Sequence, residues 1–271
     1  FLDDDMEAHP RMLAEHARSH REGADVVLGH FPLHPESPAG FLSAGVKQWA
    51  EERGRQLSQR NGHLTLHDLM FGHASLKRDL FNDVGAFDTD FTKDGSFGDE
   101  DLDLGYRLQQ RGARVVFNLY AISYQKYVVT PQQYLRQVHQ TGHADVVFAR
   151  KHPTENGIFY QHAWGETFGP HVWRGLARWS PVTVPLMAAL RATALGRLRR
   201  AESESATRFF REIAAMEYWR GVVEAGGVPA TSAVRVLTYH AVRDLGADPV
   251  LASYGVPPET FRAQMKMLKR F

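Results

Sequence analysis

The chain of 271 residues is 43% hydrophobic, which is enough to bury a substantial core in one large or two small domains. Its 32 lysines and arginines nearly balance its 31 aspartates and glutamates, so the overall charge does not argue for nucleic acid as a partner. The absence of cysteine excludes a disulfide framework, a thiolate metal site and a cysteine nucleophile, and it fits a cytoplasmic protein. No apolar run reaches the roughly 18 residues of a membrane span.

At the start of the chain, Phe1 and Leu2 run into three aspartates, as the last residues of a buried parallel strand would in an open α/β sheet. Strands of that kind need neighbours, which here would have to precede residue 1. Near the other end, Phe261, Met265 and Leu268 keep a helical spacing up to the last residues. We therefore expect the chain to be a fragment of a longer protein.

Strands and helices alternate through the first half of the chain, which predicts an α/β sheet. The sequence predicts strands at 24–29 and 113–118, with strand and loop over 66–76. Proline begins and glycine ends several of the expected helices, because proline suits the first helical turn and glycine suits the left-handed position after the last. These helices are predicted over about 10–23, 40–60, 76–85, 99–112 and 131–150.

Tryptophan and arginine become frequent from about residue 160 to 225, in helical segments that glycine and proline interrupt. The next stretch, "GGVPATSA", predicts a linker, after which "VRVLTYHAV" restarts as an apolar strand. We therefore expect three parts: an α/β domain over 1–155, a helical connector over 156–229 and the start of another domain over 230–271.

Asp3, Asp4 and Asp5 form the first acidic cluster. Side chains of an extended segment alternate between faces, so Asp3 and Asp5 could converge on one Mg²⁺ or Mn²⁺, and oxygen ligands favour such hard cations over zinc. The alternative is a solvated turn in which Asp5 or a neighbour caps the following helix.

The second acidic cluster, "GDEDLDLGYRL", begins a predicted helix. Acidic residues in a first turn are favoured by the helix dipole for purely structural reasons. Two acidic sites at strand-to-helix junctions nevertheless suit a reaction in which one site holds a metal-bound diphosphate and the other supplies a general base.

Three segments in this order, "FLDDDM", "FGHASLKRDLFNDVGAFDTDF" and "GDEDLDLGYRLQQRGARVVF", resemble the second half of a family 2 inverting glycosyltransferase with a GT-A fold. They correspond to its DxD motif, its acceptor-side segment and its Glu-Asp helix, and their order and spacing match over residues 1 to about 152. The resemblance implies a partial, Rossmann-like nucleotide-sugar transferase domain without its N-terminal half. The fragment by itself is therefore expected to be inactive.

The resemblance also implies a role for each matching residue. Asp3 and Asp5 become the residues that bind the Mg²⁺ or Mn²⁺ ion and the donor diphosphate, with Asp4 beside them. Asp101 becomes the general base that deprotonates the acceptor hydroxyl, and Glu100 its neighbour. The implied donor is a nucleotide-diphosphate sugar, in the first place a UDP-sugar, and the implied acceptor is a carbohydrate.

Four further residues are weaker candidates. Gly72 and His73 lie in the acceptor-side segment and are candidates for contact with the acceptor, although a structural role for His73 is an open alternative. Lys151 and His152 follow the helix predicted over 131–150 and could meet the diphosphate.

The last stretch, from "VRVLTYHAV" to Phe271, resembles the opening strand and first helix of a polysaccharide deacetylase. That family's catalytic Asp-Asp strand end and paired-histidine helix do not occur before Phe271, so Tyr239 and His240 cannot form its site alone. We expect a bifunctional protein of polysaccharide biosynthesis. Two alternatives stay open: a non-catalytic module that binds nucleotide or carbohydrate, and a chain whose main activity is deacetylation.

The segment "ALRATALGRLRR" places an apolar helical face between arginines. This face consists of Leu190, Ala194, Leu195 and Leu198. Peripheral contact with an anionic membrane is one interpretation, and docking of the helix on the transferase domain is the other.

Overall fold

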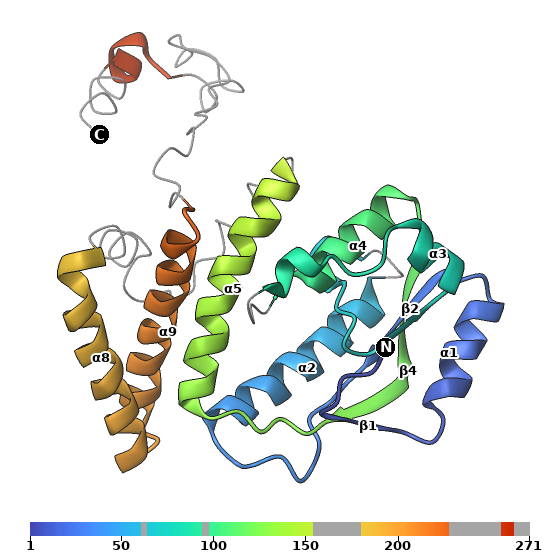
Figure 1. Cartoon of the computed structure of the whole chain (residues 1–271), viewed down its shortest axis with the longest axis horizontal. Helices are drawn as coiled ribbons and strands as arrows, with labels where there is room; N and C mark the ends of the chain where they lie inside the picture. The colour runs from blue at the N-terminus through green and yellow to red at the C-terminus, as the bar shows by residue number, and fades with distance from the viewer. Residues whose placement is uncertain (61–63, 94–97, 154–179, 228–255, 263–271) are drawn as a thin grey trace. The chain divides into compact units, whose positions relative to one another are not determined.

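The computed structural model describes residues 1–60, 64–93, 98–153, 180–227 and 256–262 (Figure 1). The chain divides into two compact units, 1–229 and 230–271. In the second unit the description is limited to a short helical stretch within 256–262, so Tyr239 and His240 lie outside the described residues.

A mixed four-stranded sheet forms the first layer of unit 1. The strands are β1 (Met6–Ala8), β2 (Val26–His30), β3 (Ala74–Leu76) and β4 (Val115–Gln125), in the order β1-β4-β2-β3. The two central strands, β2 and β4, are parallel, and each outer strand pairs antiparallel to its neighbour. The α/β class that the alternating pattern predicts is therefore confirmed at this level.

The start of the chain differs from the prediction. Phe1 and Leu2 are 49% and 41% exposed, and Leu2 pairs antiparallel with His73, so they are not the end of a buried parallel strand. The Asp3 N–H donates to the Gly72 carbonyl at 2.8 Å, which extends this pairing by one step. An apolar pair indicates extended backbone, but it does not indicate the direction of the neighbouring strand.

Five helices accompany the sheet: α1 (Met12–Arg21), α2 (Phe41–Gln59), α3 (Arg78–Asp83), α4 (Glu100–Gln110) and α5 (Pro131–Lys151). All five were predicted. The left-handed glycines expected after three of them have φ of +96° at Gly23, +87° at Gly85 and +74° at Gly112. Leu104 and Leu108 of α4 share one core with Val26 and Leu28 of the sheet, which positions the start of α4 beside the sheet edge.

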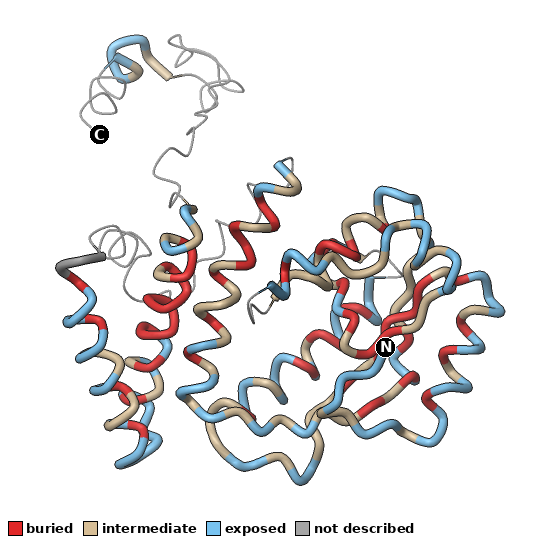
Figure 2. Tube along the Cα trace, in the orientation of Figure 1, coloured by how far each residue is buried: buried red, intermediate tan, exposed pale blue. Residues whose placement is uncertain are grey.

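A helical layer completes unit 1. Helices α8 (Ser180–Arg200) and α9 (Glu204–Glu224) pack with α5 around a second core that includes Phe210, Tyr218 and Trp219 (Figures 1 and 2). The backbones of helices α5 and α9 are in contact where the two helices cross. A Cβ added to Gly142 would lie 2.1 Å from the Tyr218 carbonyl oxygen, so only glycine fits there. This packing keeps the helices after residue 180 in the same compact unit as the sheet, so no division between units falls near residue 155.

The apolar face of α8 is occupied by this core. Ala194 and Leu198 are buried in it, and Leu190 and Leu195 pack against it, so these side chains dock on α5 and α9 rather than face a membrane surface. None of the helices in the described ranges has the length and hydropathy that a membrane crossing requires.

Candidate active site

A cleft with a volume of about 570 Å³ lies where residues 3–6, residues 70–72 and the start of α4 meet. Five carboxylates line it, and no described lysine or arginine does. The carboxylates are those of Asp3, Asp4, Asp5, Glu100 and Asp101. The two acidic clusters of the sequence thus come together on one cleft, which we refer to as the acidic cleft.

The position of Asp3 depends on Gly72. The two residues share the backbone hydrogen bond of the edge pairing, and a Cβ on Gly72 would lie 2.4 Å from Asp3 Oδ2. Gly72 therefore lets the carboxylate lie directly against the chain. The pKa of Asp3 is raised, first by lost solvation and then by repulsion from Asp5, Asp4 and Glu100.

Asp5 has an unsatisfied oxygen. Its Oδ2 accepts from Gln125 Nε2 at 3.1 Å, whereas its buried Oδ1 has no hydrogen-bond partner among the described residues. A buried carboxylate oxygen without a partner is unfavourable, and a cation would satisfy it. Asp3 and Asp5 therefore fit a hard divalent cation.

The carboxylates alone do not complete such a site. Within the described residues, no group of three or more histidine, aspartate or glutamate side chains is arranged to hold a metal. Mg²⁺ is commonly bound through one or two carboxylates, with water and substrate phosphates as the other ligands. The acidic cleft fits that pattern rather than a cage made by the protein alone.

Asp101 is held rigidly in the first turn of α4. Its Oδ2 accepts the Phe71 N–H at 2.7 Å, in the segment just before Gly72. Burial raises the pKa of Asp101 to about 6, an effect that the Phe71 hydrogen bond opposes and that repulsion from Glu100 and Asp3 increases. A carboxylate with this pKa is suited to accept a proton near neutral pH.

Asp99 anchors the start of α4, although the sequence marks it only as part of an acidic run. It has a left-handed backbone with φ of +65°, and burial followed by repulsion from Asp145 raises its pKa well above the usual value. The Tyr218 hydroxyl donates to Asp145 in turn. The Asp99 side chain lies beside that of Asp145 in α5, which ties the start of α4 to the helical layer.

Asp103 faces away from the acidic cleft, as its helical position predicts. Its carboxylate is buried and accepts from Arg107 Nη2 at 2.6 Å and from His152 Nε2 at 2.7 Å. The two acidic residues of this turn therefore differ in role: Asp101 faces the cleft, and Asp103 holds the helix in place.

His73 does not line the cleft, which corrects its prediction as an acceptor contact. The ring is 1% exposed, and its Nε2 lies 3.0 Å from His16 Nε2 while its Nδ1 lies 2.8 Å from Ser123 Oγ. Burial lowers the pKa of both histidines to about 4, so both are neutral. Side chains alternate across an extended segment, so Gly72 lies at the cleft and His73 packs inward.

Lys151 and His152 also lie outside the lining of the acidic cleft, so the structure gives them no contact with a diphosphate there. Lys151 forms ion pairs with Asp88 and Asp90, and His152 bonds to Asp103. Both side chains tie the end of α5 to neighbouring segments.

Part of the cleft lining is aromatic, a feature that the sequence did not indicate. Trp49 of α2 is 41% exposed there, with its ring 5.6 Å from that of Phe31 and 5.8 Å from the Arg53 guanidinium. A second hollow of about 300 Å³ shares Trp49 and Tyr127 with the cleft and so extends it along α2. Nothing in the helical periodicity distinguishes Trp49 from a core residue.

Gln137 of α5 lines the cleft as well.

No protein-family model matches the chain, and a search of curated proteins finds no match. The function is therefore argued from the geometry of the site.

Proposed function

We propose that the protein transfers a sugar from a nucleotide-diphosphate donor to a carbohydrate hydroxyl, as a metal-dependent inverting glycosyltransferase. The observation that carries this proposal is the meeting of two differently placed carboxylate groups in one cleft. Asp3 and Asp5 form one group, with an unsatisfied oxygen, and Asp101 forms the other, with a pKa near 6. A diphosphate with its cation needs the first group, and a hydroxyl that must lose a proton needs the second.

In this reaction Asp101 accepts the proton of the acceptor hydroxyl while the hydroxyl oxygen attacks the anomeric carbon. The bond from that carbon to the diphosphate oxygen breaks, and its electron pair leaves with the diphosphate. A divalent cation held by Asp3 and Asp5 would neutralise the charge of this leaving group. The attack comes from the side opposite the leaving group, so the configuration is inverted without a covalent intermediate.

The aromatic part of the cleft lining suits the acceptor. Carbohydrate rings have apolar faces that pack on aromatic side chains, and Trp49 offers such a face beside the catalytic carboxylate. The Phe31 ring and the Arg53 guanidinium hold the Trp49 ring in place. We assign Trp49 and Tyr127 to the acceptor side of the cleft.

The test is Asp101→Asn in the full-length protein. Turnover should fall by about 10²- to 10⁴-fold, while donor affinity stays near that of the unsubstituted protein, because a general base acts mainly in the transition state. Asp79→Asn is the matched control, since Asp79 is exposed on α3. Asp103→Asn does not serve as a control, because it removes buried hydrogen bonds.

The alternative of a non-catalytic binding module predicts a different result. Such a module would bind nucleotide or carbohydrate without transferring sugar, so Asp101→Asn would change no rate. Release of acetate by the full-length protein with no sugar transfer would instead favour the deacetylase interpretation.

A further inference from the structure

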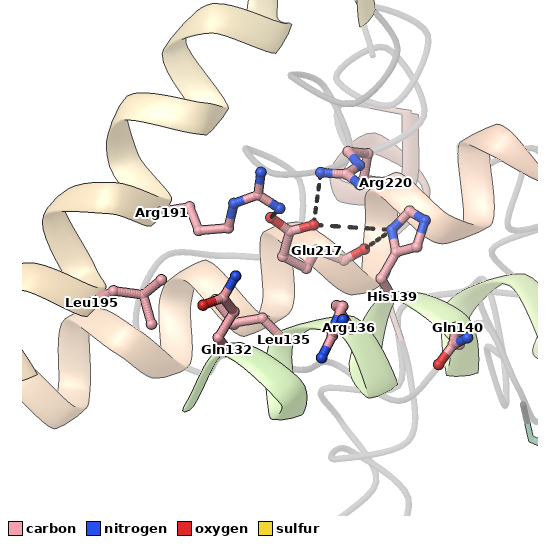
Figure 3. A pocket seen from close by; sticks show the side chains of 9 residues that line it. All are labelled: Gln132, Leu135, Arg136, His139, Gln140, Arg191, Leu195, Glu217 and Arg220. Carbon is pink, nitrogen blue, oxygen red and sulfur yellow. Dashed lines mark hydrogen bonds and ion pairs between the residues drawn. The ribbon is translucent and has the colours of Figure 1, made fainter. Parts of the chain in front are cut away.

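A second pocket, with a volume of about 350 Å³, lies between α5, α8 and α9 and shares no lining residue with the acidic cleft (Figure 3). Its charged lining is mostly basic. Arg136 and His139 come from α5, Arg191 from α8, and Arg220 and Glu217 from α9. We refer to it as the basic pocket.

Glu217 is the buried centre of this pocket, with 1% of its surface exposed. Its carboxylate lies 2.8 Å from Arg220 Nη1 and 3.5 Å from Arg191 Nη1 (Figure 3). A buried carboxylate is strongly unfavourable without opposite charge beside it, so Glu217 holds these two guanidiniums at the pocket. The arrangement is therefore built into the helical core.

The positive charge exceeds what the carboxylates balance. Glu224 is the second carboxylate of the group and pairs with Arg220 Nε at 3.0 Å and with His139 Nε2 at 3.0 Å. Three guanidiniums thus face two carboxylates. The pocket has a surplus of positive charge that an anion would balance.

Two of the arginines have uncommitted donors. No described residue pairs with Arg136, which is exposed on α5. Among the described residues, Arg191 pairs with Glu217 alone, at 3.5 Å. The N–H groups of Arg136 and Arg191 are therefore available to a ligand.

The remaining lining suggests what else the ligand carries. Gln132 offers an amide donor and acceptor, and Leu135 and Leu195 add apolar surface. The volume is at the lower end of the range of about 300–1,000 Å³ that is typical of small-molecule pockets. This fits an anionic group joined to a small polar moiety rather than a bare ion.

We propose that the basic pocket binds the phosphate group of a small phosphorylated ligand, with Arg136 and Arg191 as its direct contacts and Glu217 as the residue that positions Arg191 and Arg220. The planar guanidinium matches phosphate oxygens in a two-point contact, which a single ammonium does not. The phosphate can belong to a soluble sugar phosphate or to a phospholipid headgroup.

The test is calorimetric binding to the full-length protein in EDTA, so that no cation loads the acidic cleft. The probes are a hexose 1-phosphate and, separately, vesicles of phosphatidylglycerol or of phosphatidylcholine. Arg136→Gln should weaken binding by about tenfold or more, the loss expected for a charge-assisted contact. Arg199→Gln is the matched control, because Arg199 is exposed on α8 outside the pocket.

The melting temperature of each variant serves as a check on the fold. Arg136 has no partner among the described residues, so Arg136→Gln should leave the melting temperature unchanged. Arg191→Lys is the second variant: it keeps the charge beside Glu217 but loses the two-point contact, so it should also weaken binding. Saturable binding of the hexose phosphate would identify a soluble ligand, and binding to phosphatidylglycerol vesicles alone would identify a headgroup. The proposal is overturned if neither probe binds, or if Arg199→Gln weakens binding as much as Arg136→Gln.

Discussion

The acidic cleft and the basic pocket border the same helix but have opposite charge imbalances. Gln137 of α5 lines the cleft, and its neighbour Arg136 lines the pocket. Adjacent residues of a helix point about 100° apart, so one helix can serve both sites. Each site gathers more charge of one sign than it neutralises, which the protein tolerates where a ligand of the opposite sign binds.

The two sites also differ in how their charges are positioned. In the cleft, backbone groups hold the carboxylates, through the Phe71 N–H at Asp101 and the close approach of Gly72 to Asp3. In the pocket, a buried carboxylate holds the cations. Substitutions in the cleft should therefore change chemistry more than stability, and substitution of Glu217 should change stability.

The largest expected effect is the pH dependence of turnover. Asp101 must be ionised to act as a base, and its pKa in the free protein is about 6. Well below that pH, kcat/KM should fall tenfold per pH unit, which amounts to about fiftyfold between pH 6, where half of the groups are ionised, and pH 4. Steady-state kinetics of the full-length protein over this range would measure it.

The fall of kcat/KM at low pH can be distinguished from acid unfolding of the protein. A carboxyl group whose pKa is raised by folding stabilises the folded state below its ordinary pKa, and this contribution is lost as the pH rises through about 6. Asp101 itself therefore favours the fold at low pH. A profile without an inflection between pH 5 and 7, in protein that stays folded by circular dichroism, would contradict the assignment.

The next effect distinguishes the pocket from the cleft. Glu217→Gln should lower the free energy of unfolding by about 2–3 kcal/mol, because Arg191 and Arg220 lose the charge that holds them. This is below the cost of a fully buried pair, since the Arg191 side chain is 39% exposed. Denaturant unfolding would measure it, with Glu224→Gln as the matched control.

Glu224 also pairs with Arg220 but is 49% exposed, so its substitution should cost less than about 1 kcal/mol. Equal losses for the two variants would show that burial of Glu217 is not what organises the pocket.

The smallest of these effects concerns Gly72. Gly72→Ala should weaken metal-dependent binding of a nucleoside diphosphate by about tenfold, because the added Cβ would lie 2.4 Å from Asp3 Oδ2 and displace that carboxylate. Gly196→Ala on α8 is the control, since a Cβ there meets nothing within 4 Å and Gly196 lines neither the cleft nor the hollow that extends it. Unchanged affinity in Gly72→Ala would show that the position of Asp3 does not matter for binding.

Local features of the sequence predicted much of this structure. The glycines after α1, α3 and α4 marked the helix ends. The two acidic segments lie in one cleft, although residues 3–5 lead into β1 and not, as predicted, from a strand into a helix. The helix ends were predictable because a helix end depends on residues that are near in sequence.

Features that depend on distant residues were not predicted. The sequence left His73 open between an acceptor contact and a structural role, because its partners His16 and Ser123 are 57 and 50 residues away. Lys151 looked like a free cation, but it pairs with Asp88 and Asp90. The basic pocket likewise exists because α5 and α9 meet at their glycines, which no periodicity within either helix indicates.

The central claim is that Asp3 and Asp5 hold a divalent cation together with the diphosphate of a donor. The most direct measurement is titration calorimetry of the full-length protein with uridine diphosphate, with and without Mn²⁺, for the unsubstituted protein and Asp5→Asn. The account predicts binding that requires Mn²⁺ and that Asp5→Asn abolishes with the melting temperature unchanged, because the cation would be held through the unsatisfied Oδ1 of Asp5. Binding that is equally strong without Mn²⁺, or unchanged in Asp5→Asn, would contradict it.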